Sequence, residues 1–195
     1  MEKSNFFALL SRMKLVQRWG LMRNTYTENL AEHSYETATI AHCLGLINNA
    51  SGGTVDAARL AVMALYHDCS EIITGDMPTP IKYLNGSLKH AYKQVEAEAQ
   101  ELLLSTLPDE LEGRFRDAFP GPDTDPYEKK LLKAADKLSA YLKCLEELSH
   151  GNHEFRDAAQ KGLQDLNAMG LPEVVSFLSC FLDGYGLTLD QLKIK

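Results

Sequence analysis

Residues 127–147 constrain the fold most, because their apolar side chains recur at helical spacing. The steps between successive apolar positions alternate between four and three, at Leu131, Ala135, Leu138, Leu142 and Leu145. Such a stripe is typical of an amphipathic helix packed against neighbours. Helical spacing recurs over 30–48, 57–67, 87–107, 155–169 and 172–182, and no sustained alternation of apolar and polar residues occurs. The sequence therefore predicts an all-α fold.

The pattern indicates one folded unit. The chain has 195 residues, a length that suits one domain with a sizeable core. Gly52-Gly53 ends one predicted helix, and residues 119–126, with three prolines and one glycine, form a loop. No repeat and no linker divides the chain. We expect a single compact helical domain over residues 1–195.

Composition excludes several classes of function. The formal net charge is -7, which disfavours binding to a nucleic-acid polymer, since such binding needs many cations. No apolar run approaches the roughly 20 residues that cross a bilayer, and residues 1–10 do not resemble a secretory signal. Because the four cysteines are scattered, we interpret them as small buried apolar residues rather than disulfide or zinc-knot partners. The expected location is the cytoplasm, with no contact with a membrane.

His67-Asp68 stands where an apolar helix face ends and has no packing reason to be there. If the helix continued, Glu71 would fall between the two residues on one narrow arc. Two carboxylates and an imidazole share an arc only when a cation or hydrogen-bond donors compensate them. The dipeptide alone is a weak motif, and a surface histidine that caps the helix is the alternative.

Two further residues fit the same interpretation. His33 lies on a mostly apolar helix face, where a hydrogen-bonded core histidine is the alternative to a ligand. Asp136 lies beside the leucine stripe, and a carboxylate there needs a positive partner, which Lys133 or Lys137 could supply at the surface. Together, His33, His67, Asp68 and Asp136 would offer two nitrogens and two oxygens to a divalent cation such as Mn, Fe, Co or Mg, with positions left open for water and substrate.

The other histidines lie outside this set. His42 is about half a turn away from His33 on its helix. The remaining three have polar surroundings and are expected at the surface: His90, His150 and His153.

Two segments outside the metal set are candidates for ligand binding. Residues 75–80 contain two prolines and form a stiff loop beside the acidic cluster, or a simple connection between helices. Arg18-Trp19 closes the first predicted helical segment and contains the only tryptophan. An arginine fork beside an aromatic plane can hold a phosphate and a sugar or base. A contact with a partner subunit is the alternative.

These residues together resemble the HD-domain metal-dependent phosphohydrolases, whose pattern of a histidine, a His-Asp pair and a distant aspartate is matched by His33, His67-Asp68 and Asp136. The whole chain is most similar to the bacterial 5'-deoxynucleotidases of the YfbR type. That closer likeness rests on Phe6-Phe7, Arg18-Trp19, Met22-Arg23-Asn24, Thr27-Glu28-Asn29, Glu32-His33-Ser34, Tyr66-His67-Asp68, Ser70-Glu71, Thr74-Gly75-Asp76, Pro78-Thr79-Pro80 and residues 140–147.

The resemblance implies a homodimeric enzyme that hydrolyses deoxyribonucleoside 5'-monophosphates with one divalent ion, Co or Mn, in each subunit. It also implies roles for individual residues. Glu71 and Asp76 would be catalytic, and His33, His67, Asp68 and Asp136 would bind the metal. The substrate would lie against Arg18, Trp19, His33, Asp68, Asp76, Met77, Pro78, Thr79 and Asp136.

Two rival functions remain at this point. One is an HD hydrolase of a different ester, such as a nucleoside triphosphate or a signalling nucleotide. A triphosphate usually calls for more cationic side chains around the pocket than Arg18 and Lys82 supply. The other is a helical interaction module that keeps a metal for structure alone and has no phosphatase activity.

Overall fold

The centre of the fold is the packing of two long helices, α2 (Leu30–Ala50) and α8 (Pro126–Ser149). In the computed structural model, residues 1–78 and 85–192 are described, and within these ranges the chain forms helices and no strand. The predicted all-α class is confirmed. The remaining elements are α1 (Phe6–Leu10), η1 (Ser11–Leu15), α3 (Ala57–Tyr66), α4 (Glu71–Thr74), α6 (Gly86–Leu104), α7 (Asp109–Arg116), η2 (His153–Phe155), α9 (Arg156–Ala168), α10 (Pro172–Phe181) and η3 (Leu182–Gly186).

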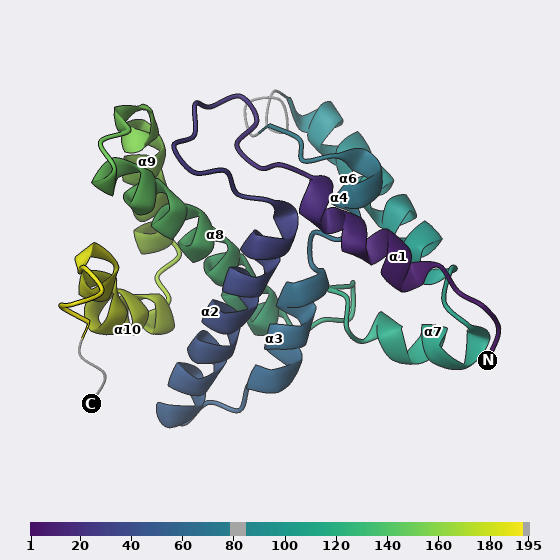
Figure 1. Ribbon diagram of the computed structural model, residues 1–195. Helices are drawn as coiled ribbons and strands as arrows, with labels where there is room; N and C mark the ends of the chain where they lie inside the picture. The colour runs from purple at the N-terminus through teal and green to yellow at the C-terminus, as the bar shows by residue number, and fades with distance from the viewer. Residues whose placement is uncertain (79–84, 193–195) are drawn as a thin grey trace.

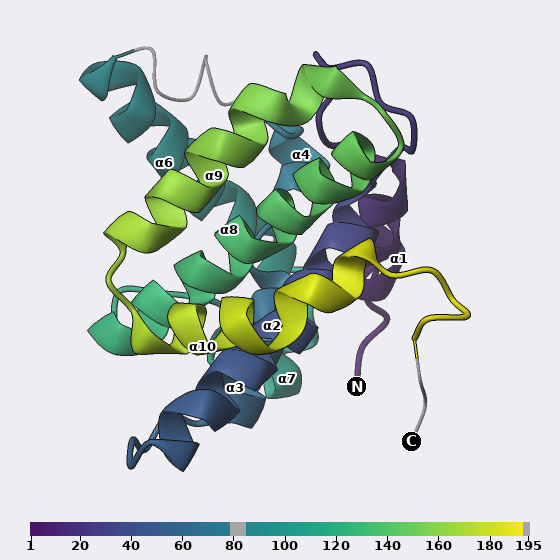
Figure 2. The same ribbon diagram turned by 90° about the vertical axis from the view of Figure 1, so that its left-hand side faces the viewer.

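The helices lie in two groups on either side of α2, α3 and α8. Figure 1 shows α1, α4, α6 and α7 on one side of these central helices, and α9 and α10 on the other. Helix α9 runs alongside α8, as Figure 2 shows, while α3 packs closely against α2. No helix in the described ranges is long and apolar enough to cross a membrane.

Polar side chains at the helix starts explain several boundaries. Asn29 accepts hydrogen bonds from the first turn of α2, while Glu32 reaches back to the Asn29 backbone, which makes a capping box. Asp56 caps α3, as predicted, and Asp125 caps α8 immediately before Pro126. These caps satisfy backbone N–H groups that a helix leaves free at its start.

Four details differ from the sequence-based expectation. The helix that contains Tyr66 ends there, and a turn over residues 67–70 separates it from Glu71, which begins α4. The first helical segment ends at Leu15, so Arg18-Trp19 lies in a loop. Helix α7 was not expected, although Pro108 precedes acidic and then basic residues in the order that suits a helix dipole. Cys180 is exposed, whereas Cys69 and Cys144 are buried as predicted.

The apolar core consists of two clusters that share α2. The larger cluster lies between the main part of α2, α3, α8, α9 and α10, and the smaller one joins the start of α2 to α1, η1 and the end of α6. Between Leu30 of the smaller cluster and Ala38 of the larger one, α2 buries three polar residues: His33, Ser34 and Thr37. A polar seam therefore separates the two apolar clusters.

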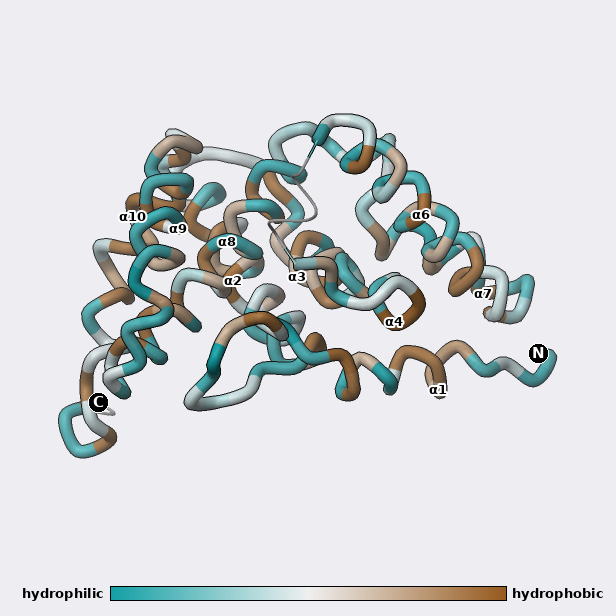
Figure 3. The backbone as a smooth tube through the Cα atoms, turned by 90° about the horizontal axis from the view of Figure 1, so that it is seen from above, coloured by the Kyte–Doolittle hydropathy of each residue, from teal (hydrophilic) through white to brown (hydrophobic). Residues whose placement is uncertain are grey.

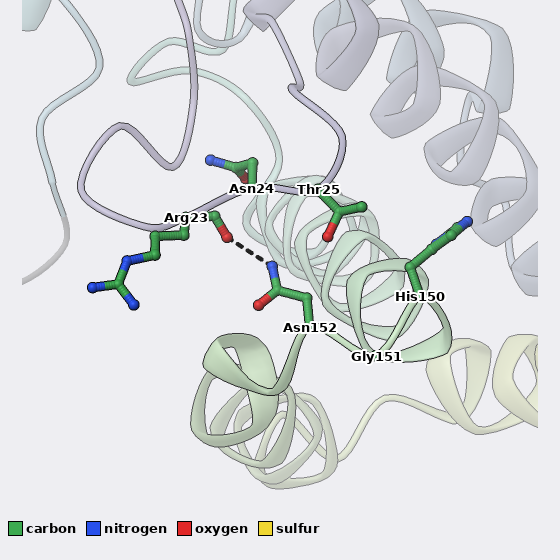
Figure 4. A pocket seen from close by; sticks show the side chains of 6 residues that line it. All are labelled: Arg23, Asn24, Thr25, His150, Gly151 and Asn152. Carbon is green, nitrogen blue, oxygen red and sulfur yellow. Dashed lines mark hydrogen bonds between the residues drawn. The ribbon is translucent and has the colours of Figure 1, made fainter.

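The loop between η1 and α2 is fixed by a buried carboxylate of α8. Glu147 is fully buried and accepts hydrogen bonds from the backbone N–H groups of Thr25 and Tyr26, from Asn152 Nδ2 and from Lys143 Nζ. Lys143 Nζ also donates to the carbonyl of Tyr26. Figure 4 shows the adjoining pocket, where Asn152 donates to the carbonyl of Arg23.

Replacing Glu147 with Gln should destabilise the protein in a pH-dependent way. Burial raises the pKa of Glu147, but hydrogen bonds from Lys143, Asn152 and the loop backbone outweigh it and lower the pKa to about 2. The stabilisation by this carboxylate is therefore complete above its ordinary pKa of 4.5 and is lost as the pH falls towards 2. At pH 7 we expect Glu147→Gln to lower the free energy of unfolding by about 3 kcal/mol, because it leaves Lys143 without its ion-pair partner.

Urea unfolding of both proteins at pH 7 and pH 3 measures this difference. The difference in the free energy of unfolding between the wild type and Glu147→Gln should be smaller at pH 3 than at pH 7. An equal difference at both pH values would contradict the role of the ionised carboxylate.

Candidate metal centre

The four residues selected from the sequence lie together where α2, the end of α3 and α8 meet. One ligand atom from each of His33, His67, Asp68 and Asp136 lies within 4.8 Å of the others. His33 Nε2 is 3.3 Å from Asp136 Oδ1 and 3.7 Å from Asp68 Oδ2, although these residues are far apart in the chain. Because α3 ends at Tyr66 and a turn over residues 67–70 precedes Glu71, the predicted helical arc with Glu71 between His67 and Asp68 is not formed.

His67 presents a nitrogen lone pair to the cluster. Its Nδ1 lies 2.7 Å from the carbonyl oxygen of Ala64, which can only accept, so Nδ1 carries the proton. Nε2 is then left without a proton in the neutral ring, and among residues 1–78 and 85–192 no hydrogen-bond donor reaches this buried atom. Asp68 Oδ2 lies 3.1 Å from this atom. In the neutral ring two lone pairs would face each other at this distance, so either a proton on Nε2 or a metal cation must lie between them.

The charges around the cluster also call for a cation. Burial lowers the pKa of His67, but the adjacent Asp68 carboxylate outweighs it and raises the pKa to about 9. The side chain therefore holds a proton unless another positive charge replaces it. Burial and the guanidinium of Arg18 keep the pKa of His33 below its ordinary value, so that imidazole is neutral.

Asp136 fits both sequence-based alternatives, because one of its oxygens faces the cluster and the other pairs with a lysine. Its Oδ2 lies 2.6 Å from Lys133 Nζ, while its Oδ1 faces His33. Burial raises the pKa of Asp136, but Lys133 and the two histidines outweigh it and keep the carboxyl well below its usual range. Lys137 pairs with Asp165 instead. The carboxylate is thus ionised and points one oxygen into the cluster.

Arg18 and Trp19 form one edge of the site through Glu28. Glu28 is buried, and its Oε2 accepts hydrogen bonds from Arg18 Nε at 3.1 Å and from Trp19 Nε1 at 2.9 Å. Arg18 Nη1 reaches to 3.6 Å from Asp68 Oδ2. Burial lowers the pKa of Arg18, and the surrounding carboxylates more than compensate. The guanidinium therefore stays charged at the rim of the cluster.

Trp19 adopts a backbone conformation that few residues other than glycine adopt. Its φ is 58°, and its ring packs 5.3 Å from the ring of Phe155. Backbone strain of this kind persists where the surrounding structure holds the residue in place. The backbone pairing of Gln17 with Asn29 and the bond from Trp19 to Glu28 are two such constraints. Glu28 was missed as a functional candidate, since the sequence distinguished it only as part of the Thr27-Glu28-Asn29 motif and gave it no role.

The other predicted residues lie nearby in the chain. Glu71 is buried, and its backbone N–H donates to the carbonyl of Asp68. Gly75, with a φ of 74°, turns the chain out of α4 into residues 76–78, and the charge of Asp76 contributes to the raised pKa of Arg18. Thr79 lies outside the described residues. The three histidines expected at the surface are exposed: His90, His150 and His153. His42, predicted to lie outside the metal set, is also exposed.

The residues present fit a divalent ion. The buried His67 Nε2 has no donor, two ionised carboxylates face two imidazole nitrogens, and oxygen and nitrogen ligands of this mixture suit Mn, Fe, Co or Zn. Four protein ligands would leave coordination positions open on an ion that takes six.

The sequence comparisons agree on one family over nearly the whole chain. The family model described as 5'-deoxynucleotidase YfbR-like matches residues 5–185. The 5'-deoxynucleotidase VV1113 of Vibrio vulnificus is 48% identical over 193 residues, covering 98% of this chain and 100% of that protein. A 5'-deoxynucleotidase of Vibrio cholerae is 47% identical with the same coverage.

Solved structures share the fold. An HD-domain phosphohydrolase from Listeria innocua superposes with a TM-score of 0.79 at 26% identity, covering 93% of this chain and 88% of that one. The HD phosphohydrolase DatZ of cyanophage S-2L, solved with dA and one catalytic Zn²⁺ ion, superposes with a TM-score of 0.60 at 22% identity, covering 91% and 96%. Helical HD domains thus accommodate this arrangement of helices.

Replacing Glu28 with Ala should release Arg18 and Trp19 together. Because Trp19 is the only tryptophan, its fluorescence reports directly on this edge of the site. We expect the emission maximum to shift to longer wavelength, since the indole N–H loses its acceptor and gains access to water.

Glu173→Ala is the matched control, because Glu173 is also buried and also accepts from two side chains, Asn48 and Tyr127. It should leave the emission unchanged. A Glu28→Ala spectrum identical to that of the wild type would contradict the assignment.

Proposed function

The chain belongs to the YfbR-like 5'-deoxynucleotidase family of HD-domain proteins, and from this membership we propose that it is a metal-dependent phosphoric monoester hydrolase. The proposed reaction converts deoxyribonucleoside 5'-monophosphates to deoxynucleoside and phosphate. The observation that carries the proposal is the cluster of His33, His67, Asp68 and Asp136, within 4.8 Å of one another, in a chain that matches 5'-deoxynucleotidases along almost its full length.

The four clustered residues are proposed to hold one divalent ion. When bound there, such an ion would supply Lewis-acid activation of a water molecule and of the phosphate. We propose Co or Mn, since both accept mixed imidazole and carboxylate ligands.

Arg18 is proposed to bind the phosphate. Its Nε is held by Glu28 and its Nη1 lies 3.6 Å from Asp68 Oδ2, so the guanidinium stands where it could meet an oxyanion beside the cluster. A guanidinium can donate two parallel hydrogen bonds to a phosphate. The ion pair with Glu28 holds this fork in place before the substrate arrives, which lowers the entropy lost on binding.

Glu71 is proposed to orient and deprotonate the attacking water. Glu71 is buried and lies three residues after Asp68, to whose carbonyl its backbone N–H donates. A carboxylate beside the metal site can accept a proton from water during in-line attack. Asp76 is proposed to protonate the departing 5' oxygen. Both roles are supported by position along the chain and by the family pattern.

Trp19 is proposed to exclude ribonucleotides. Held between Glu28 and Phe155, its ring forms a rigid wall, and a ribose 2'-hydroxyl that met this wall or residues 76–79 would lose its water without gaining a partner. Met77 and Pro78 are proposed to line the same part of the substrate site.

The enzyme is proposed to act as a homodimer in the cytoplasm. Support for a dimer comes from an apolar hollow between α1, the start of α2 and the end of α3, lined by Phe7, Leu10, Met13 and Leu65 among others. Phe7 is 62% exposed, and the brown colour of α1 in Figure 3 shows that its residues are hydrophobic. A second copy of the chain would remove these side chains from water.

A panel of phosphate esters tests the proposed activity. Deoxyribonucleoside 5'-monophosphates should be hydrolysed with a kcat/KM at least about tenfold above that of the ribonucleotides. A chelator should abolish the activity, and added Mn or Co should restore it. Preference for triphosphates or signalling nucleotides would favour the rival hydrolase. A chelator that lowers only the melting temperature, with no ester hydrolysed, would favour a structural metal.

Glu71→Gln should separate chemistry from binding. We expect kcat to fall by about 10²- to 10⁴-fold, because general-base assistance is lost, while metal and nucleotide affinities stay close to those of the wild type. Glu98→Ala, an exposed change on α6, serves as the control with normal turnover. Near-normal kcat in Glu71→Gln would remove this residue from the mechanism.

A further inference from the structure

The imidazole of His33 uses its two nitrogens for different contacts. Nε2 faces the cluster, 3.3 Å from Asp136 Oδ1, whereas Nδ1 points away from it and lies 3.0 Å from Ser139 Oγ. Both His33 and Ser139 are completely buried. The contact at Nδ1 is therefore sheltered from water and determines how the ring is held.

The hydroxyl of Ser139 has one proton, which it donates to Glu36 in a hydrogen bond. Ser139 Oγ lies 2.6 Å from Glu36 Oε2, and an ionised carboxylate can only accept. Burial raises the pKa of Glu36, and the hydrogen bond from Ser139 opposes that rise. With its proton committed to Glu36, the Ser139 oxygen accepts from Nδ1–H of His33. Nε2 is then the unprotonated nitrogen, and the Thr37 hydroxyl 3.4 Å away can donate to it.

The same three-residue spacing occurs on both helices that build this chain of contacts. His33 and Glu36 are three residues apart on α2, and Asp136 and Ser139 are three residues apart on α8. Residues at this spacing lie on one face of a helix. Where α2 and α8 pack together, one turn brings His33 to Asp136 and the next brings Glu36 to Ser139.

We propose that Ser139 and Glu36 are positioning residues for the metal centre, which hold His33 in the tautomer and orientation that direct Nε2 at the cation. Neither side chain is within the group of four ligands. Outer partners of metal-binding histidines typically change metal affinity by about 10- to 100-fold when removed. The inference rests on the proposed metal centre and not on the identity of the substrate.

Metal affinity in the absence of nucleotide tests this role. Isothermal titration calorimetry with Mn²⁺ and Zn²⁺ should show Ser139→Ala binding about 10- to 100-fold more weakly than the wild type. Glu36→Ala should also weaken binding, by about tenfold, because the released Ser139 hydroxyl can donate to Nδ1 and drive the ring proton to Nε2. The double variant should bind no more weakly than Ser139→Ala alone, since both changes break one chain of contacts.

Tyr127→Phe is the matched control. Tyr127 also lies on α8 and its hydroxyl also donates to a glutamate, Glu173, which makes no contact with the cluster. Its metal affinity should equal that of the wild type even if its stability falls. Circular dichroism checks that each variant is folded, and Glu36→Ala, at a half-buried position, decides the question if Ser139→Ala does not fold.

Metal affinities of both single variants within threefold of the wild type would overturn the proposal, as would fully additive losses in the double variant. A wild-type protein that binds neither ion would overturn the metal centre itself. A protein that shows the expected affinities but hydrolyses no nucleotide would refute the proposed function and leave this inference standing.

Discussion

The polar seam between the two apolar clusters is the constraint on which the site depends. Where α2 packs against α8, His33 lies beside Asp136 at 3.3 Å, and Asp68 completes a pair of carboxylates in a largely buried space. Burying like charges together costs free energy unless an opposite charge compensates them. Arg18 and Lys133 compensate from the edges, and a divalent ion would do so from the centre. The apolar clusters on either side hold these groups at fixed distances.

Two buried carboxylates hold the loop before α2 in place beside the candidate metal centre. Glu147 fixes the middle of the loop from α8, and Glu28 fixes Arg18 and Trp19 from within the loop. Both carboxylates are buried and each accepts more than one hydrogen bond from the loop, so each holds its segment of the loop in place. Because the loop is restrained at both places, the guanidinium is held beside the cluster, and less conformational entropy would be lost if a phosphate bound there, as we propose.

Much of the candidate site was recognisable in the sequence, because polar residues at positions where the apolar pattern predicts a packed helix face indicate a role other than packing. His33 on an apolar face, Asp136 beside a leucine stripe and His67-Asp68 at a helix end all fall in this class, and the structure brings the four together. Glu28, Glu36 and Ser139 gave no such signal. Their sequence surroundings are ordinary, and their importance comes from the atoms that meet them across the fold.

The sequence by itself determined the helices and the types of ligand, because apolar periodicity, capping residues and side-chain chemistry are local properties. Only the tertiary structure decided that α3 stops at Tyr66 and that Trp19 sits at a φ of 58°, since these conformations are imposed by packing and hydrogen bonds from elsewhere in the chain. The same holds for the distances within the metal cluster. Residues separated by a hundred positions meet there only because two apolar cores must bury their surfaces around α2 at once.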